Sequence, residues 1–135
     1  MNIKIKLQRT EDLPYFLELN GFVVEDLGND ILRVQRDSEL PVFLKISDNH
    51  IFYEVDLGNI SEIISQDLLL KILDLNTEIL PVSFGMDTSN PDDHRLVLVE
   101  SRETEDMNDS ELLSVFDALE LAADRAESLF ASVAK

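Results

Sequence analysis

The stretch QDLLLKILDLNTEILPVSFGMDTSNPDDHRLVLVE, residues 66–100, decides the fold. Its first part is apolar at helical spacing, and residues 80–86 then form an apolar run that contains a proline, which suits an edge strand. Residues 88–93 are polar and predict a loop. In residues 95–101, Leu96 and Leu98 alternate with Val97 and Val99. A strand that is apolar on both sides is expected to lie in the interior of a sheet that is covered twice, by its own helices or by a second subunit.

The helix before these strands is apolar around much of its circumference. We expect the helical region to begin at Ser61 and Glu62 and to continue to about residue 75. A surface helix needs only one apolar stripe, so this helix is predicted to be central or covered on a second side. The apolar positions are Ile60, Ile63, Ile64, Leu68, Leu69, Ile72, Leu73 and Leu75.

The first sixty residues predict one helix and a series of short strands. Residues 3–7 alternate apolar and polar side chains, as a short strand or an extended arm does. A helix follows, capped by Thr10 or Asp12 and ended by Gly21. Four strand signals come next, at residues 22–27, 31–36, 41–47 and 51–57, each bounded by turn residues.

The sequence of the last two strand signals predicts how these strands pair in a hairpin. A two-residue turn at Asp48-Asn49 would pair Ile46 with Ile51 and place the apolar side chains of both strands on one face. Phe43 and Phe52 then lie diagonally adjacent on the other face. Two readings stay open: another part of the chain covers these aromatic rings, or they form an exposed contact patch.

The C-terminal part predicts one long helix, over residues 110–133. Asn108 and Glu111 have the spacing of a capping box. Apolar residues recur every three to four positions, as in a coiled-coil seam or a helix that lies across a sheet. We favour the helix across the sheet. The whole chain, residues 1–135, then predicts a single α+β domain with an antiparallel sheet and helices mainly on one face, in the order helix, three or four strands, helix, two strands, helix.

Composition excludes several classes of partner. The chain has 135 residues, 28 of them acidic and 11 basic, and a formal net charge of −17. This charge disfavours nucleic acids and anionic membranes and would attract basic protein segments. No apolar run approaches the length of a membrane span, so we expect no membrane insertion. The chain has no cysteine, which fits a cytoplasmic protein.

No residue constellation indicates catalysis or a cofactor. His50 and His94 are the only histidines, and both fall in predicted turns. Asp92, Asp93 and His94 are adjacent on a loop and do not converge on one metal ion. The glycines form no phosphate-binding loop. We therefore expect a protein that is not an enzyme and binds no cofactor.

Short motifs, most of them within residues 66–100, resemble the type III secretion chaperone fold, which Tir-type chaperones share with YbjN-like proteins. They are LLKILDLN at residues 69–76, FGMD at 84–87 and RLVLV at 95–99, together with LNGF at 19–22. Within this fold group the chain is similar to the YjfI-like bacterial family, which is associated with PspA-like membrane-stress proteins. The family has three strands in its meander, where this chain predicts four, or three with one broken.

The resemblance implies a protein-binding module, chaperone-like or adaptor, that forms a homodimer and holds a segment of a partner protein. The alternative is a regulatory or stress-response protein that binds one specific partner, for example a PspA-like protein. Phe43 and Phe52 are the candidates for partner contact. The resemblance implies a dimer interface at the second helix and the following strands, with the candidates Leu69, Ile72, Leu73, Val97 and Val99.

Overall fold

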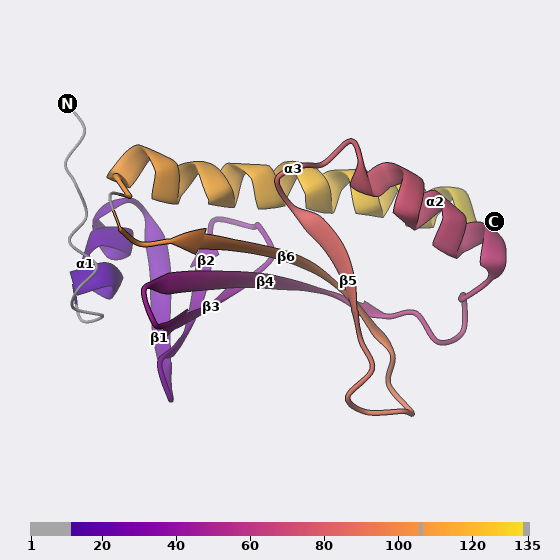
Figure 1. The fold of residues 1–135 in the computed structure, drawn as a ribbon, viewed down its shortest axis with the longest axis horizontal. Coiled ribbons are helices and arrows are strands. Elements are labelled where there is room, and N and C mark those ends of the chain that lie inside the picture. Colours follow the sequence, from indigo (N-terminus) through magenta and orange to yellow (C-terminus); the bar gives the residue numbers. More distant parts are fainter. Residues whose placement is uncertain (1–11, 106, 134–135) are drawn as a thin grey trace.

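The computed structural model of the protein describes residues 12–105 and 107–133. The expected strand or arm at residues 3–7 lies outside the described residues. The elements within them follow the expected order and confirm the α+β class (Figure 1). They are α1 (Asp12–Leu19), β1 (Phe22–Gly28), β2 (Ile31–Arg36), β3 (Val42–Ser47), β4 (His50–Asn59), α2 (Gln66–Asn76), β5 (Ser83–Asp87), β6 (Arg95–Glu103) and α3 (Asp109–Val133).

The six strands of the described residues form one antiparallel sheet in the order β1-β2-β3-β4-β6-β5. Strands β1 to β4 each pair with the next in chain order and form the meander. The meander therefore has four strands. The strand β6 pairs with β4 and places β5 at the edge. The interior position predicted for residues 95–101 is therefore confirmed.

The helices cover one face of this sheet, with α3 running along it (Figure 1). Side chains from all three helices and from the inner sides of the strands form one buried cluster. Phe116 of α3 belongs to this cluster, with its ring centroid 4.6 Å from that of Phe22 and 5.7 Å from that of Tyr53. Arg36 joins β2 to α3, since its guanidinium donates to Asp117 at 2.9 Å.

The predicted register of the β3–β4 hairpin is confirmed. Ile46 pairs with Ile51 and Leu44 with Tyr53. Asp48 and Asn49 form the turn with φ values of 46° and 65°. Such positive φ values are what a two-residue turn between twisted strands needs, and Asp and Asn tolerate them.

Two elements begin later than the sequence predicts. The helix α2 starts at Gln66, not at Ser61, because the hydroxyl of Ser65 accepts the backbone N–H of Leu68 at 3.0 Å and caps the helix there. The strand β5 starts at Ser83, not at residue 80. Residues 79–82 form a turn in which the backbone N–H of Val82 donates to the carbonyl of Ile79 at 3.1 Å.

The long helix α3 begins as predicted. The side-chain oxygen of Asn108 accepts the backbone N–H of Glu111 at 2.8 Å, which is one half of a capping box. Its apolar stripe faces the sheet and is buried from Leu112 to Ala126. The prediction of a helix that lies across the sheet is confirmed.

Candidate functional site

The face of the sheet turned away from the helices carries two rows of side chains that run across the strands. The pairing registers define both rows. Residues in one row lie on the same side of neighbouring strands, so each touches or nearly touches the next. The first row is Arg33, Phe43, Glu54, Val99 and Ser83, and the second is Ile31, Lys45, Phe52 and Ser101.

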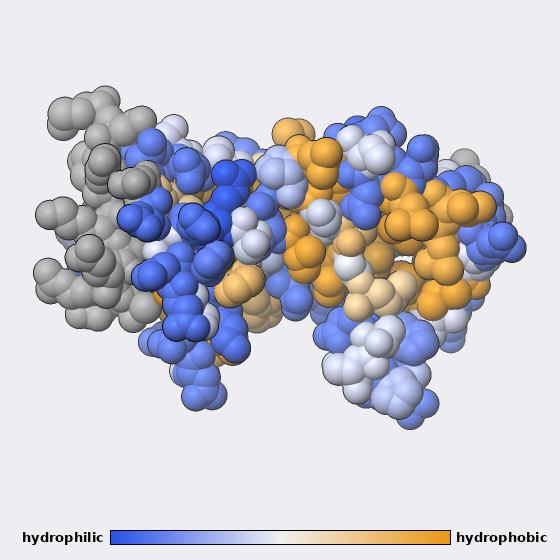
Figure 2. Space-filling view, in the orientation of Figure 1, coloured by the Kyte–Doolittle hydropathy of each residue, from blue (hydrophilic) through white to orange (hydrophobic). Residues whose placement is uncertain are grey.

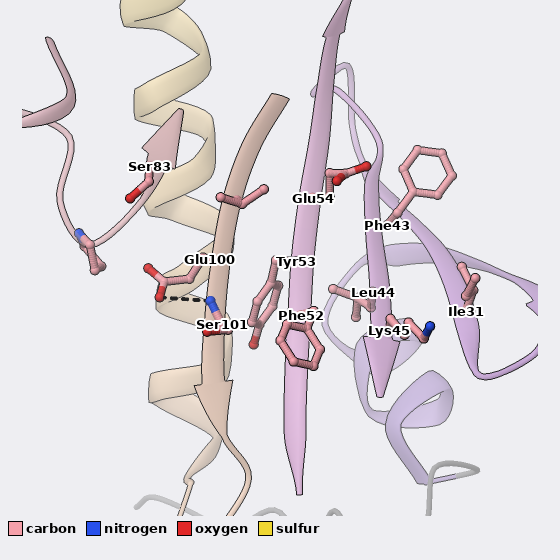
Figure 3. Close-up of a pocket in the computed structure, with 12 residues that line it drawn as sticks. Ile31, Phe43, Leu44, Lys45, Phe52, Tyr53, Glu54, Ser83, Glu100 and Ser101 are labelled. Carbon is pink, nitrogen blue, oxygen red and sulfur yellow. Dashed lines mark hydrogen bonds between the residues drawn. The ribbon is translucent and has the colours of Figure 1, made fainter. Parts of the chain in front are cut away.

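These rows line an open pocket of about 580 Å³, which we call the outer-face pocket (Figure 3). Its walls come from β2, β3, β4 and β6 and from the start of β5. Phe52 is 45% exposed and Phe43 is half-buried. The residues that line it are Ile31, Phe43, Leu44, Lys45, Phe52, Tyr53, Glu54, Pro81, Ser83, Val99, Glu100 and Ser101.

The four central positions of the pocket alternate aromatic and charged side chains. Phe43 is paired with Glu54, and Lys45 is paired with Phe52. The two phenylalanines therefore occupy one diagonal of a square, and the two opposite charges occupy the other. The ring of Phe52 also stacks on His50, with centroids 5.9 Å apart. This arrangement offers an incoming chain apolar contact with one charge of each sign beside it.

The surroundings of the Glu54 carboxylate disfavour its negative charge. Burial, together with the negative charges of Asp87 and Asp56, raises the pKa of the Glu54 carboxyl above its usual value. Asp56 is bound by Arg95 at 3.0 Å. Among the described residues, none forms a hydrogen bond or ion pair with the Glu54 carboxylate. In Figure 3 its carboxylate points from β4 toward β3, on the side of Phe43.

Tyr53 and Glu100 border the pocket, but their side chains leave β4 and β6 on the helix side of the sheet, where the Tyr53 ring packs on Phe116. The Tyr53 hydroxyl and Glu100 Oε2 are buried and have no hydrogen-bond partner among the described residues. Oε1 of Glu100 accepts the backbone N–H of Ser101 at 3.2 Å and lies 3.4 Å from Nε of Arg102. Burial raises the pKa of the Tyr53 hydroxyl, so this group keeps its proton.

A second surface lies on α2, on the side turned away from the core. The helix buries Leu68, Ile72 and Leu75, yet Leu70 and Leu73 are exposed. Figure 2 shows apolar side chains gathered over α2 and the segment between α2 and β5, whereas the β1–β3 end is polar. The exposed apolar side chains of this region, which we call the α2 surface, are Ile63, Ile64, Leu69, Leu70, Leu73 and Leu80.

The candidate interface residues fall in three places. Leu69 and Leu73 belong to the α2 surface, and Leu73 is 63% exposed. Ile72 is 6% exposed and packs in the core. Val99 is half-buried in the outer-face pocket, and Val97 is buried on the same face of the sheet. The structure therefore separates the candidates into a helix surface, the core and the sheet.

A groove beside α3 adds a feature that sequence reasoning missed. It has a volume of about 320 Å³ and runs between α3 and residues 78–80. Leu80 and Leu121 line it and are both mostly exposed. Arg125 of α3 pairs with Glu78 at 3.0 Å across one side of it. Leu121 stands outside the buried stripe of its helix, which was the signal available in the sequence.

The loop that carries His94 has a structural task. Asp93 accepts from Arg95 at 3.1 Å and from the side-chain amide of Asn59 at 2.6 Å, which ties β4 to β6. The described residues contain no group of three or more His, Cys, Asp or Glu side chains that could hold a metal ion. Nor does any helix in the described ranges have the length and apolar character of a membrane span.

Comparison with known proteins identifies the fold. No family model matches the sequence, and no curated protein matches it. A chain of the heterodimeric ExoU–SpcU complex from the type III secretion system of Pseudomonas aeruginosa superposes with a TM-score of 0.69 at 19% identity, over 87% of this chain and 96% of that chain. The fold is that of the type III secretion chaperones.

YbjN from E. coli, described as a candidate transcription regulator, has the same fold. It superposes with a TM-score of 0.63 at 13% identity, over 95% of this chain and 96% of that chain. The resemblance read from the motifs at residues 69–76, 84–87 and 95–99 is thereby confirmed at the level of the fold. At these identities the likeness concerns the fold alone, and function has to be argued from the surfaces.

Proposed function

We propose that this chain is a non-enzymatic protein-binding module, chaperone-like or adaptor, that forms a homodimer in the cytoplasm and holds a segment of a partner protein. The observation that carries the proposal is the α2 surface, where exposed leucines stand on a helix whose other side is already buried. Contiguous exposed apolar patches of this kind mark protein contacts. The similar chain in the ExoU–SpcU complex belongs to a heterodimer, which supports a protein partner.

The α2 surface suits a second copy of the chain. Lys71 is the middle residue of α2, which spans Gln66–Asn76, and Leu69 and Leu73 flank it. Two antiparallel α2 helices around a two-fold axis at this point would place Leu69 of one copy against Leu73 of the other. The Lys71 side chain lies on the other side of the helix from Leu69 and Leu73, where it pairs with Asp67 at 3.0 Å, so it stays outside this contact.

The outer-face pocket suits an extended segment of a partner. The strand β5 pairs with β6 only as far as Ser83 and Val99, whereas β4 pairs with β6 on to Glu103. Beyond Val99, no described strand pairs with β6 on the side that faces β5. An added strand could pair along this free edge and place its side chains among those of the pocket.

Purification of the tagged chain from its native host tests this proposal. We expect the wild-type chain to retain a partner protein, and Phe52→Ala to retain much less of it because the variant loses an exposed wall of the pocket. Val23→Ala, a change at an exposed apolar residue of β1, is the matched control and should retain as much as the wild type. Equal retention by the wild type and Phe52→Ala would contradict binding at the pocket.

A regulatory protein with one specific partner is the second candidate. The groove between α3 and residues 78–80 favours it, because its exposed Leu80 and Leu121 would fit the apolar side of a partner helix, as a PspA-like protein could provide. The same purification separates the two candidates. One stoichiometric partner, lost with Leu121→Ala, indicates regulation, and a mixture of loosely held segments indicates a chaperone.

A further inference from the structure

The strand β6 has a free edge next to the outer-face pocket. Beyond Val99 its end pairs with β4 only, because the pairing with β5 stops there. The backbone N–H of Thr104 donates to the carbonyl of Asn49 at 2.8 Å, so Thr104 faces β4. Alternate residues of an antiparallel strand face opposite neighbours, so the backbone groups of Ser101 and Glu103 face away from β4. No described strand pairs with them on that side.

Glu100 covers part of this edge. The backbone N–H of Ser101 donates to Glu100 Oε1 at 3.2 Å, which is at the long end of hydrogen-bond lengths. Figure 3 shows the carboxylate beside β6, on the side of Ser83. The Glu100 side chain is 7% exposed, and its Oε2 has no donor among the described residues. The edge is therefore capped by one long hydrogen bond, which an added strand can replace.

The segment before α1 has the sequence pattern of a strand. Residues 1–11 lie outside the described residues, and the sequence NIKIKL within them alternates polar and apolar side chains. Lys4, Lys6 and Arg9 are basic, and no acidic residue precedes Glu11. The whole chain carries a net charge of −17. Charge therefore favours contact between this segment and the rest of the chain.

The segment can reach the free edge because α1 begins at the same end of the sheet. Pro14 of α1 lines a small pocket with Ile46 of β3, and β6 ends beside His50, the first residue of β4. From β3 to a strand beyond β6 there are three strand spacings, about 14 Å. The chain between Leu7 and Asp12 spans up to about 17 Å when extended. A strand that leads into this link would run parallel to β6.

We propose that residues 3–7 add to the free edge of β6 as a short parallel strand when no partner is bound. The apolar side chains of this segment lie on the outer face, beside Phe52 and Val99, and its lysines lie on the side of Glu100. This placement rests on the proposed function, because the segment occupies the edge that a partner strand would take. The segment then competes with the partner and lowers its apparent affinity.

Paired cysteines test the contact directly, since the chain has no cysteine of its own. Ser101→Cys is combined with one cysteine in the segment, and disulfide formation is followed by electrophoresis without reductant and by mass spectrometry. We expect a bond within one chain from one of the apolar positions and none from the lysine positions, whose side chains face the other way. The segment variants are Ile3→Cys, Ile5→Cys and Leu7→Cys, with Lys4→Cys and Lys6→Cys as controls.

A second pair controls for random encounters. The apolar position that bonds to Ser101→Cys is combined instead with Val23→Cys, an exposed position of β1 at the other edge of the sheet. This pair should cross-link much more slowly. Equal cross-linking to both edges, no bond to Ser101→Cys from any position, or bonds only between two chains would overturn the inference. These results do not depend on a partner, so they are separate from the test of the proposed function.

Competition with the partner is tested in the full chain. Ile5→Glu places a charge on the apolar side of the segment, so partner retention in the purification should rise by roughly twofold to fivefold. Gln8→Glu adds the same charge outside residues 3–7 and should leave retention unchanged. Retention that Ile5→Glu leaves unchanged or lowers would contradict competition for the edge. If the wild type retains no partner, the proposed function fails, and the cross-links still decide the contact.

Discussion

Tyr53 and Glu100 face each other across β4 and β6, and each buries one oxygen that has no partner among the described residues. A buried hydroxyl without a partner costs about 1–3 kcal/mol. We therefore predict that Tyr53→Phe, which removes the hydroxyl and keeps the ring on Phe116, leaves the free energy of unfolding unchanged or raises it by about 1 kcal/mol. Urea unfolding measures this change. A loss of more than about 1 kcal/mol would show that the hydroxyl has a partner in solution, such as a bound water.

The two faces of α2 predict opposite effects for neighbouring residues. Ile72 is in the core, so Ile72→Ala should lower the free energy of unfolding by about 2–4 kcal/mol. Leu73 is mostly exposed, so Leu73→Ala should cost the isolated fold less than about 1 kcal/mol. Urea unfolding at a concentration that favours the monomer makes the comparison. Similar losses for both variants would mean that Leu73 is buried within one chain.

We predict that replacing Glu54 stabilises the fold by an amount that depends on pH. Its folded pKa lies above the ordinary value of 4.5, so the folded state holds this proton more tightly than the unfolded state does. Relative to an uncharged side chain, Glu54 therefore lowers stability at neutral pH, and this penalty disappears as pH falls through the raised pKa. Glu54→Gln should stabilise the fold at about pH 7 by a few tenths of a kcal/mol, since the group is largely exposed to solvent.

The check on this prediction is the pH profile of the free energy of unfolding. The stability difference between Glu54→Gln and the wild type should vanish below the ordinary glutamate pKa. A difference that stays constant with pH would show that the charge of Glu54 is not its cause.

We expect the loss of the Arg36 side chain to lower the free energy of unfolding more than the loss of another surface ion pair does. Its guanidinium bonds Glu39 and Asp117 and lies 5.1 Å from the centroid of the Phe22 ring. Arg36→Ala should therefore lower the free energy of unfolding by about 1–2 kcal/mol. Arg125→Ala, which removes one exposed pair with Glu78, should cost less than about 0.5 kcal/mol. Equal effects in thermal or urea unfolding would contradict the role of Arg36 as a link between β2 and α3.

Local patterns were enough to predict much of the fold. The alternation on both sides of Asp48-Asn49 sets the register of one hairpin, because only one pairing keeps both apolar sets on the same face. The periodicity of residues 110–133 likewise predicts α3. The predicted start of α2 was wrong because Ile60, Ile63 and Ile64 continue the helical spacing, while the cap at Ser65 interrupts the helix.

The candidate site was less accessible from the sequence. Phe43 and Phe52 follow from the hairpin alone, since both point away from the apolar side. Glu54 and Val99 become neighbours in the pocket only through the pairing of β4 with β6, which joins segments more than forty residues apart. That Glu54 has no ion pair depends on the positions of every nearby cation, which one sequence does not supply.

Sedimentation equilibrium of the wild type, Leu73→Glu and Leu19→Glu tests most directly whether the α2 surface holds a second chain. Leu19 of α1 is 67% exposed, close to the 63% of Leu73, so Leu19→Glu is a matched control. We predict a mass of twice 15.3 kDa for the wild type and Leu19→Glu, and a shift to the mass of one chain for Leu73→Glu, since a charge in an apolar interface is costly. A wild-type mass of 15.3 kDa at every concentration would contradict the homodimer.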